Sequence, residues 1–121
     1  MTPTEHIKES QRTRGHLAIG VNASNEDLLH ATIGISTEAG ELLDAVKKHL
    51  FYGKKLDIVN IHEELGDICW YMSMLMEWSG TTYEEVMERN IDKLRVRYPD
   101  KFTNQDALQR NLELERKVLE A

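Results

Sequence analysis

The sequence contains one cysteine, Cys69, and no apolar run long enough to cross a membrane. A lone cysteine excludes a disulfide framework within the chain and is typical of a reducing compartment. A membrane helix needs about 20 consecutive apolar residues, and the N-terminal residues also lack the apolar stretch of a secretion signal. We therefore expect a cytoplasmic protein that has no membrane partner.

Positive charge is scarce as well. The chain has 15 Lys and Arg residues against 21 Asp and Glu residues, which gives a formal net charge of −6. Nucleic acids attract basic surfaces through their phosphate backbone, so we expect no nucleic-acid partner. A small nucleotide is compatible with this charge, because metal ions can supply positive charge locally. The length of 121 residues suits one hydrophobic core, and we expect a single domain over residues 1–121.

Strand signals are nearly absent, since no run alternates apolar with polar residues. Helix signals are frequent, including the capping boxes Thr2–Glu5 and Thr82–Glu85. The expected helices run from about residue 3 to Gly15 or Gly20, from a cap at Ser24 or Asn25 to about 50, and over about 57–79, 83–98 and 106–121. The sequence therefore predicts an all-α fold, a four-helix bundle with a C-terminal helical tail over residues 103–121.

Two acidic pairs lie in the two longest predicted helices, Glu38 with Glu41 and Glu64 with Asp67. A spacing of three residues puts both acids of a pair on one helix face. A short connection around Gly53, which suits a left-handed helix end, makes these helices antiparallel neighbours. Four carboxylates around one small volume are costly unless a cation lies among them. We expect Mg²⁺, which prefers oxygen ligands and is often shared with substrate phosphates.

The neighbourhood of the acids is rich in glycine, with Gly34, Gly40 and Gly66 inside predicted helices. Each costs up to about 1 kcal/mol relative to alanine, so we expect a close approach of helices or room for a ligand. The apolar periodicity places the acids beside a core face rather than opposite it. The residues expected on that core face are Ile35, Ala39, Leu42, Leu43, Val46 and Leu50, then Ile58, Ile61, Leu65, Ile68, Met72 and Leu75.

The acidic pairs and a later segment resemble the MazG-like all-α nucleoside triphosphate pyrophosphohydrolases, a superfamily that includes dimeric dUTPases and dCTP pyrophosphatases. The segment Asn90–Pro99 resembles the Asn-x-x-Lys-x-x-x-Arg pattern of that family. The resemblance covers about residues 30–102, and we place the core motif region at about 26–102. Many members carry two adjacent glutamates where this chain has Thr37 and Glu38, which leaves the number of metal ions and the general base open.

The resemblance implies Mg²⁺-dependent cleavage of an NTP or dNTP between its α- and β-phosphates, giving NMP and pyrophosphate, with Mn²⁺ as a substitute ion. The residues implied to hold the metal and form the catalytic centre are Glu38, Glu41, Glu64 and Asp67. The residues implied to contact phosphate or sugar are Lys54, Tyr71, Asn90, Lys93 and Arg97.

Two other classes of protein stay open. A di-iron or di-manganese carboxylate bundle needs Glu-x-x-His on two helices, and the nearest match is a single Asp27-x-x-His30. A non-enzymatic partner-binding or regulatory module is supported by the charged tail, where Glu113 and Lys117 form an i, i+4 pair. The tail equally suits dimerisation. Because a lone unit of this size has little depth to enclose a nucleotide, we expect a homodimer or homotetramer.

Overall fold

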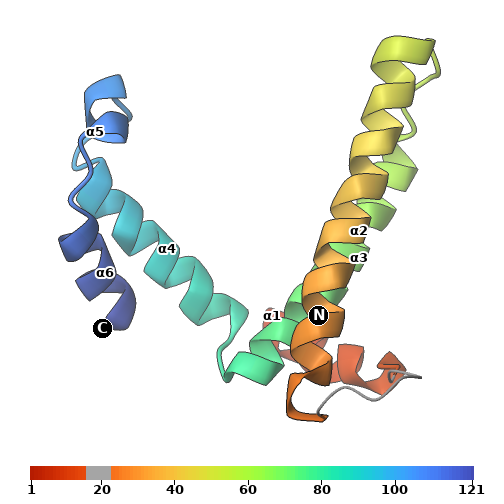
Figure 1. Ribbon diagram of the computed structural model, residues 1–121, viewed down its shortest axis with the longest axis horizontal. Coiled ribbons are helices and arrows are strands. Elements are labelled where there is room, and N and C mark those ends of the chain that lie inside the picture. The colour runs from red at the N-terminus through yellow and green to blue at the C-terminus, as the bar shows by residue number, and fades with distance from the viewer. Residues whose placement is uncertain (16–22) are drawn as a thin grey trace. The chain divides into compact units, whose positions relative to one another are not determined.

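The computed structural model describes residues 1–15 and 23–121, and within them the chain is helical with no strand (Figure 1). The all-α prediction is thereby confirmed. The elements in chain order are α1 (Pro3–Ser10), the 3₁₀ helix η1 (Gln11–Thr13), α2 (Ala23–Tyr52), α3 (Ile58–Ser79), α4 (Tyr83–Arg97), α5 (Asn104–Leu108) and α6 (Leu112–Glu120). The chain divides into two compact units, Met1–Gly80 and Thr81–Ala121. None of the described helices combines the length and apolar character of a membrane span.

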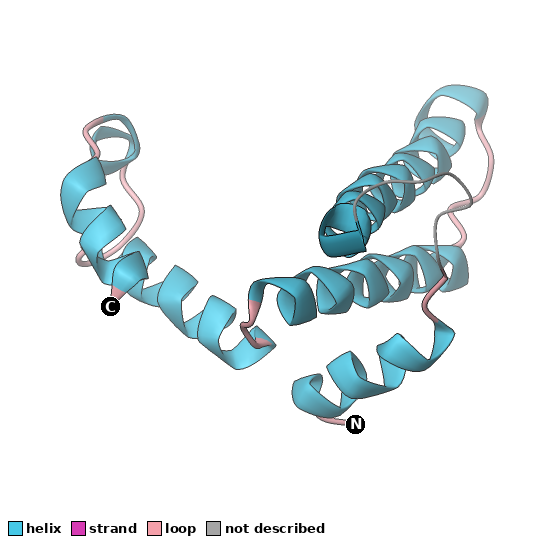
Figure 2. Cartoon of the chain, turned by 60° about the horizontal axis from the view of Figure 1, so that its bottom comes forward, coloured by secondary structure: helices cyan, strands magenta, loops and turns pink. Residues whose placement is uncertain are grey.

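The first unit is built on the pair α2 and α3, which lie side by side in both views (Figures 1 and 2). Helix α1 packs against α3. The connection between α2 and α3 begins at Gly53, whose φ of +66° is the left-handed conformation expected there. Asp57 ends the connection as the N-cap of α3, since its side chain accepts from the backbone N–H groups of Val59 and Asn60. The left-handed Gly53 and the Asp57 cap stabilise the short connection, which places α2 and α3 next to each other.

The beginning of the chain differs from the prediction in two places. Helix α1 ends at Ser10, before Gly15, and the predicted alternative end at Gly20 lies outside the described residues. The Ser10 hydroxyl donates to the carbonyl of Ile7 at 2.7 Å, a local bond that competes with helix continuation. Helix α2 begins at Ala23, before the predicted caps Ser24 and Asn25.

The core of the first unit is small and lies among α1, α2 and α3. Among the described residues, its buried apolar side chains are Ile7, Ala31, Met74 and Met76. Much of the predicted core face is exposed instead: Leu43 is 69% exposed and Ile58 is 52% exposed. None of the four buried residues was on the predicted core face, so that prediction was wrong for the most buried positions. The periodicity of a single helix identifies apolar positions but not which neighbouring helix packs on them.

The second unit consists of α4 packed against α6, with the short α5 between them in sequence. The capping box of Thr82 with Glu85 begins α4 as predicted. The tail, expected as one helix over 106–121, is two helices. Asn111 interrupts it, because its side chain accepts from the N–H of Leu114 at 3.1 Å and so caps a new helix.

Glu115 of α6 is 3% exposed and is held by two arginines. Arg97 of α4 donates to its two oxygens at 3.0 and 2.9 Å, and Arg110 donates to the same oxygens at 3.3 and 2.6 Å. The bonds from Arg97, and next those from Arg110, lower the pKa of Glu115 to about 2. This arrangement fastens the tail to α4.

Candidate functional site

Helices α2 and α3 bring together three of the four predicted metal ligands. One carboxylate oxygen each of Glu38, Glu41 and Glu64 lies within 4.8 Å of the other two. Glu64 is 6% exposed, Glu38 is half-buried and Glu41 is exposed. Solvent exposure therefore increases across the three acids, from Glu64 to Glu41. Asp67, one turn beyond Glu64, is exposed and lies outside this group of three. We call Glu38, Glu41 and Glu64 the carboxylate cluster.

The electrostatics of the carboxylate cluster favour a cation. Burial raises the pKa of Glu38 above its ordinary value. The charges of Glu41, Asp67 and Glu64, and a hydrogen bond with Glu64, raise it further. Among the residues that the structure describes, no lysine or arginine forms an ion pair with any of these four acids. Three convergent oxygen donors without a protein counter-charge fit a hard divalent cation such as Mg²⁺ or Mn²⁺.

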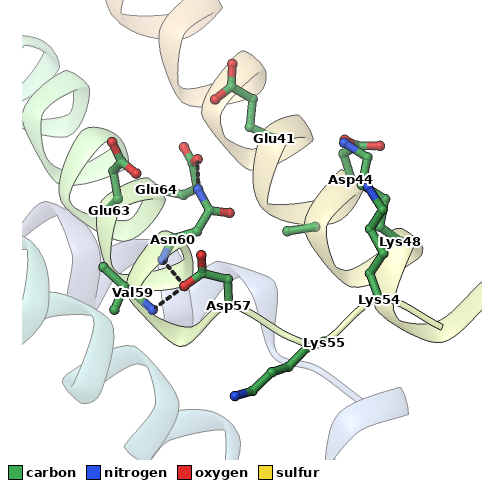
Figure 3. A pocket seen from close by; sticks show the side chains of 11 residues that line it. Glu41, Asp44, Lys48, Lys54, Lys55, Asp57, Val59, Asn60, Glu63 and Glu64 are labelled. Atoms are coloured by element: carbon green, nitrogen blue, oxygen red, sulfur yellow. Dashed lines mark hydrogen bonds and ion pairs between the residues drawn. The ribbon is translucent and has the colours of Figure 1, made fainter. Parts of the chain in front are cut away.

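A hollow of about 580 Å³ adjoins the carboxylate cluster, between the end of α2 and the start of α3 (Figure 3). Charges of both signs line it: Glu41, Asp44, Asp57, Glu63 and Glu64 on one hand, and Lys48, Lys54 and Lys55 on the other. Lys48 is bound to Asp44 at 2.6 Å. Lys54 and Lys55 form no ion pair within the described residues, so both ammonium groups are available to a ligand. The structure thus places the predicted Lys54 in the same hollow as two acids of the cluster, and it adds Lys55.

A second hollow, of about 360 Å³, is lined by Thr13, Glu38, Asp67, Trp70 and Tyr71. The ring of Tyr71 meets Trp70 edge-on at 4.9 Å between centroids. Trp70 in turn donates from Nε1 to the Thr13 hydroxyl at 2.8 Å. Tyr71, predicted to contact substrate, therefore shares a recess with two of the predicted ligands. Sequence reasoning missed Thr13, because it comes from a separate element, η1.

The glycines have different surroundings. A Cβ on Gly34 would overlap the ring of Tyr71, which confirms a close approach of α2 and α3 at that position. Gly40 and Gly66 have no atom within 4 Å of such a Cβ among the described residues, so they face open space.

Asn60 is a further residue of the site that the sequence analysis did not assign. Its side-chain Nδ2 donates to Glu64 Oε1 at 2.8 Å, and its side chain lines the larger hollow (Figure 3). The available signal was its spacing, since Asn60 is one turn before Glu64 on the same helix face.

The other predicted substrate-binding residues lie on α4, in the second unit. Asn90 is exposed, and Lys93 is half-buried with no ion pair in the described part of the chain. The guanidinium of Arg97 is bound to Glu115. Contact of these three residues with a phosphate chain stays a prediction.

The residues that favoured a di-metal carboxylate protein are engaged elsewhere. Asp27 accepts from Arg14 at 2.9 Å, and the ring of His30 meets Tyr71 edge-on at 5.5 Å between centroids. No histidine joins the carboxylate cluster among the described residues. The arrangement therefore lacks the imidazole ligands of that class.

Comparison with known proteins supplies a family. A family model described as the MazG nucleotide pyrophosphohydrolase domain matches residues 24–102, a range that contains every predicted site residue and runs through both units. The gene 37 protein of Mycobacterium phage L5 is 34% identical over 80 residues, which cover 61% of this chain and 68% of the phage protein. No solved structure was found to match the chain.

Proposed function

The chain belongs to the MazG nucleotide pyrophosphohydrolase domain family, and from that premise we propose that it is a Mg²⁺-dependent nucleotide pyrophosphohydrolase. The reaction is hydrolysis of an NTP or dNTP between the α- and β-phosphates, which gives NMP and pyrophosphate. The observation that carries this proposal is the carboxylate cluster, whose three oxygens lie within 4.8 Å of one another beside a hollow lined by lysines. A nucleotide offers the two groups that such a site can bind, a phosphate chain and its divalent cation.

In this proposal Glu38, Glu41 and Glu64 hold the cation, and Asp67 adds a carboxylate from the next turn of α3. A bound divalent cation would polarise the phosphate oxygens and lower the pKa of a water molecule. Thr37 cannot supply a carboxylate, and its hydroxyl donates to the carbonyl of Gly34 at 3.0 Å. We assign the general-base role to the carboxylate oxygen of Glu41 that does not bind the cation, because Glu41 is exposed and lines the larger hollow.

The phosphate chain is assigned to the lysine side of the larger hollow. Lys54 and Lys55 bring positive charge beside Glu41 and Glu64, and an ammonium group binds phosphate as a point charge. Tyr71 is assigned to phosphate or sugar, because it shares the smaller hollow with Glu38. For the second unit we keep the assignments of Asn90, Lys93 and Arg97 to substrate. Arg97 would have to exchange the carboxylate of Glu115 for phosphate.

We also propose that the active form is a homodimer or homotetramer in the cytoplasm. Support for assembly comes from apolar side chains that a second copy would cover, including Leu43 on α2 and Ile58 and Leu65 on α3. Exposed apolar surface of this kind is typical of protein–protein interfaces. Support for the compartment comes from Cys69, an exposed thiol that a reducing environment would protect.

The first test is the release of pyrophosphate and of orthophosphate from a panel of NTPs and dNTPs, with Mg²⁺, with Mn²⁺ and with EDTA. We expect pyrophosphate from at least one nucleotide and none with EDTA. Glu64→Gln and Asp67→Asn should abolish turnover while circular dichroism shows unchanged helix content. Glu77→Gln, an exposed acid on the same helix away from the cluster, is the matched control and should keep activity.

The alternative outcomes separate the candidate functions. Orthophosphate without pyrophosphate would move cleavage to a terminal bond and contradict the proposed reaction. No turnover with any metal and nucleotide would favour a non-enzymatic regulatory module, the second function that the sequence left open.

A further inference from the structure

Glu64 is the most enclosed acid of the carboxylate cluster, at 6% exposure. A carboxylate in that position has two oxygens that need partners, and two other acids stand within 4.8 Å. Asn60 provides a partner on the same helix, because its Nδ2–H donates to Oε1 of Glu64 at 2.8 Å. This bond occupies one oxygen of Glu64 and does not use Oε2.

Asn60 is itself held in place. Its backbone N–H donates at 3.1 Å to the side chain of Asp57, the N-cap of α3. The cap fixes the first turn of the helix, and Asn60 lies half-buried in that turn. A chain of contacts therefore leads from the helix cap through the amide to the buried carboxylate, as Figure 3 shows.

An amide is the suitable group for this position. It donates to a carboxylate without adding the charge of a lysine, which would compete with a cation for the same oxygens. It also adds no negative charge to a place where three acids already converge. Partners that hydrogen-bond a metal-binding carboxylate fix its orientation and strengthen metal binding.

We propose that Asn60 is a positioning residue of the cation site: its amide holds Glu64 in the orientation in which the carboxylate binds a divalent cation. This inference rests on the proposed function, since it presumes that the carboxylate cluster binds a metal. The inference adds Asn60, which lies outside the two acidic pairs, to the site. Asn60 would act on the cation through the side chain of Glu64.

The test is Mn²⁺ binding to the full chain without nucleotide, measured from the electron paramagnetic resonance signal of free Mn²⁺. Asn60→Ala should weaken Mn²⁺ binding by about 10- to 100-fold, the range seen when a partner of a metal ligand is removed. Asn60→Gln keeps an amide donor at the same helical spacing and should recover part of the affinity. Gln105→Ala removes a comparable i, i+4 amide bond, from Gln105 to Gln109, in the other unit and should leave binding unchanged.

The outcomes distinguish this inference from the proposed function. If the unchanged protein binds no Mn²⁺, the proposed metal site fails, and the role of Asn60 fails with it. If the unchanged protein binds Mn²⁺ and Asn60→Ala binds it equally well, only the positioning role is overturned. If the alanine variant loses helix content, the glutamine variant decides the question. Native helix content with weaker Mn²⁺ binding than the unchanged protein supports the positioning role. Native helix content with the same Mn²⁺ affinity as the unchanged protein contradicts it, because the position of the amide would then not matter.

Discussion

The ring of Tyr71 occupies the space that a side chain at Gly34 would fill, so that α2 and α3 approach each other closely one turn before Glu38. The ring cannot move aside freely, because it also meets His30 and Trp70 edge-on. This contact fixes the distance between the two helices that carry the acidic pairs. We expect a weaker contact between Tyr71 and Gly34 to disturb the carboxylate cluster, because its acids come from both helices.

Gly34→Ala should therefore destabilise the first unit. Overpacking costs about 1–3 kcal/mol, and the better helix propensity of alanine returns up to about 1 kcal/mol. Because the added Cβ would overlap the Tyr71 ring, we expect the upper part of the overpacking range and a net loss of about 2 kcal/mol in the free energy of unfolding, measured with urea, together with reduced nucleotide turnover. Gly40→Ala is the matched control, because a Cβ there has no neighbour within 4 Å in the described chain and should add stability. Equal effects of the two substitutions would contradict the special role of the Tyr71 contact.

Much of the candidate site could be predicted from helical spacing alone. The i, i+3 acids and the short connection at Gly53 predicted that Glu38, Glu41, Glu64 and Asp67 would converge. The structure brings the first three together and leaves Asp67 outside the group. The capping box at Thr82 was an equally local signal, and it is present. Such features depend on one helix or one turn, and sequence patterns specify these well.

Features that depend on distant segments could not be predicted. Nothing in the neighbourhood of Arg97 indicates that Glu115 will bind it, because the two lie on separate helices. The Thr13 hydroxyl reaches Trp70 from η1 in the same way. The exposure of Leu43 was missed for a related reason, since periodicity identifies an apolar face without identifying what packs on it. Partner choice is a tertiary property, and one sequence gives little information on it.

Neutralising one acid of the carboxylate cluster should stabilise the metal-free protein. Glu38→Gln removes a negative charge that the charges of Glu41, Asp67 and Glu64 disfavour. Because Glu38 is only half-buried, we expect a gain of a few tenths to about 1 kcal/mol in urea unfolding with EDTA. Added Mg²⁺ should stabilise the unchanged protein by mass action and the variant much less. A variant that is less stable without metal and gains as much from Mg²⁺ would contradict the assigned ligand.

Assembly can be tested at the apolar face of α2. Leu43 is 69% exposed in the single chain, so a charged residue there costs a monomer little. If a second copy covers this face, Leu43→Glu buries an unpaired charge in the interface and should reduce the molar mass measured by light scattering. Leu108→Glu, at an 86% exposed position of α5, is the control and should leave the mass unchanged. A monomeric mass for the unchanged protein would reject the proposed oligomer.

The bond between Glu115 and its two arginines should give the second unit a specific dependence on pH. The folded-state pKa of Glu115 is lowered to about 2, whereas the ordinary value is 4.5. A lowered folded pKa means that the ionised form stabilises the fold. Its contribution is fully present above pH 4.5 and is lost as pH falls from about 4.5 to 2. We expect the free energy of unfolding to decrease as pH falls through this window, as measured by circular dichroism during urea unfolding.

Glu115→Gln isolates this effect, because glutamine keeps the shape of the side chain and does not titrate. The variant should be less stable than the unchanged protein at pH 6, since two arginines lose their carboxylate, and the difference should shrink as pH approaches 2. Glu113→Gln changes an 82% exposed acid on the same helix and should follow the unchanged protein throughout. A difference between Glu115→Gln and the unchanged protein that stays constant from pH 6 to pH 2 would show that the charge of Glu115 does not hold the tail on α4.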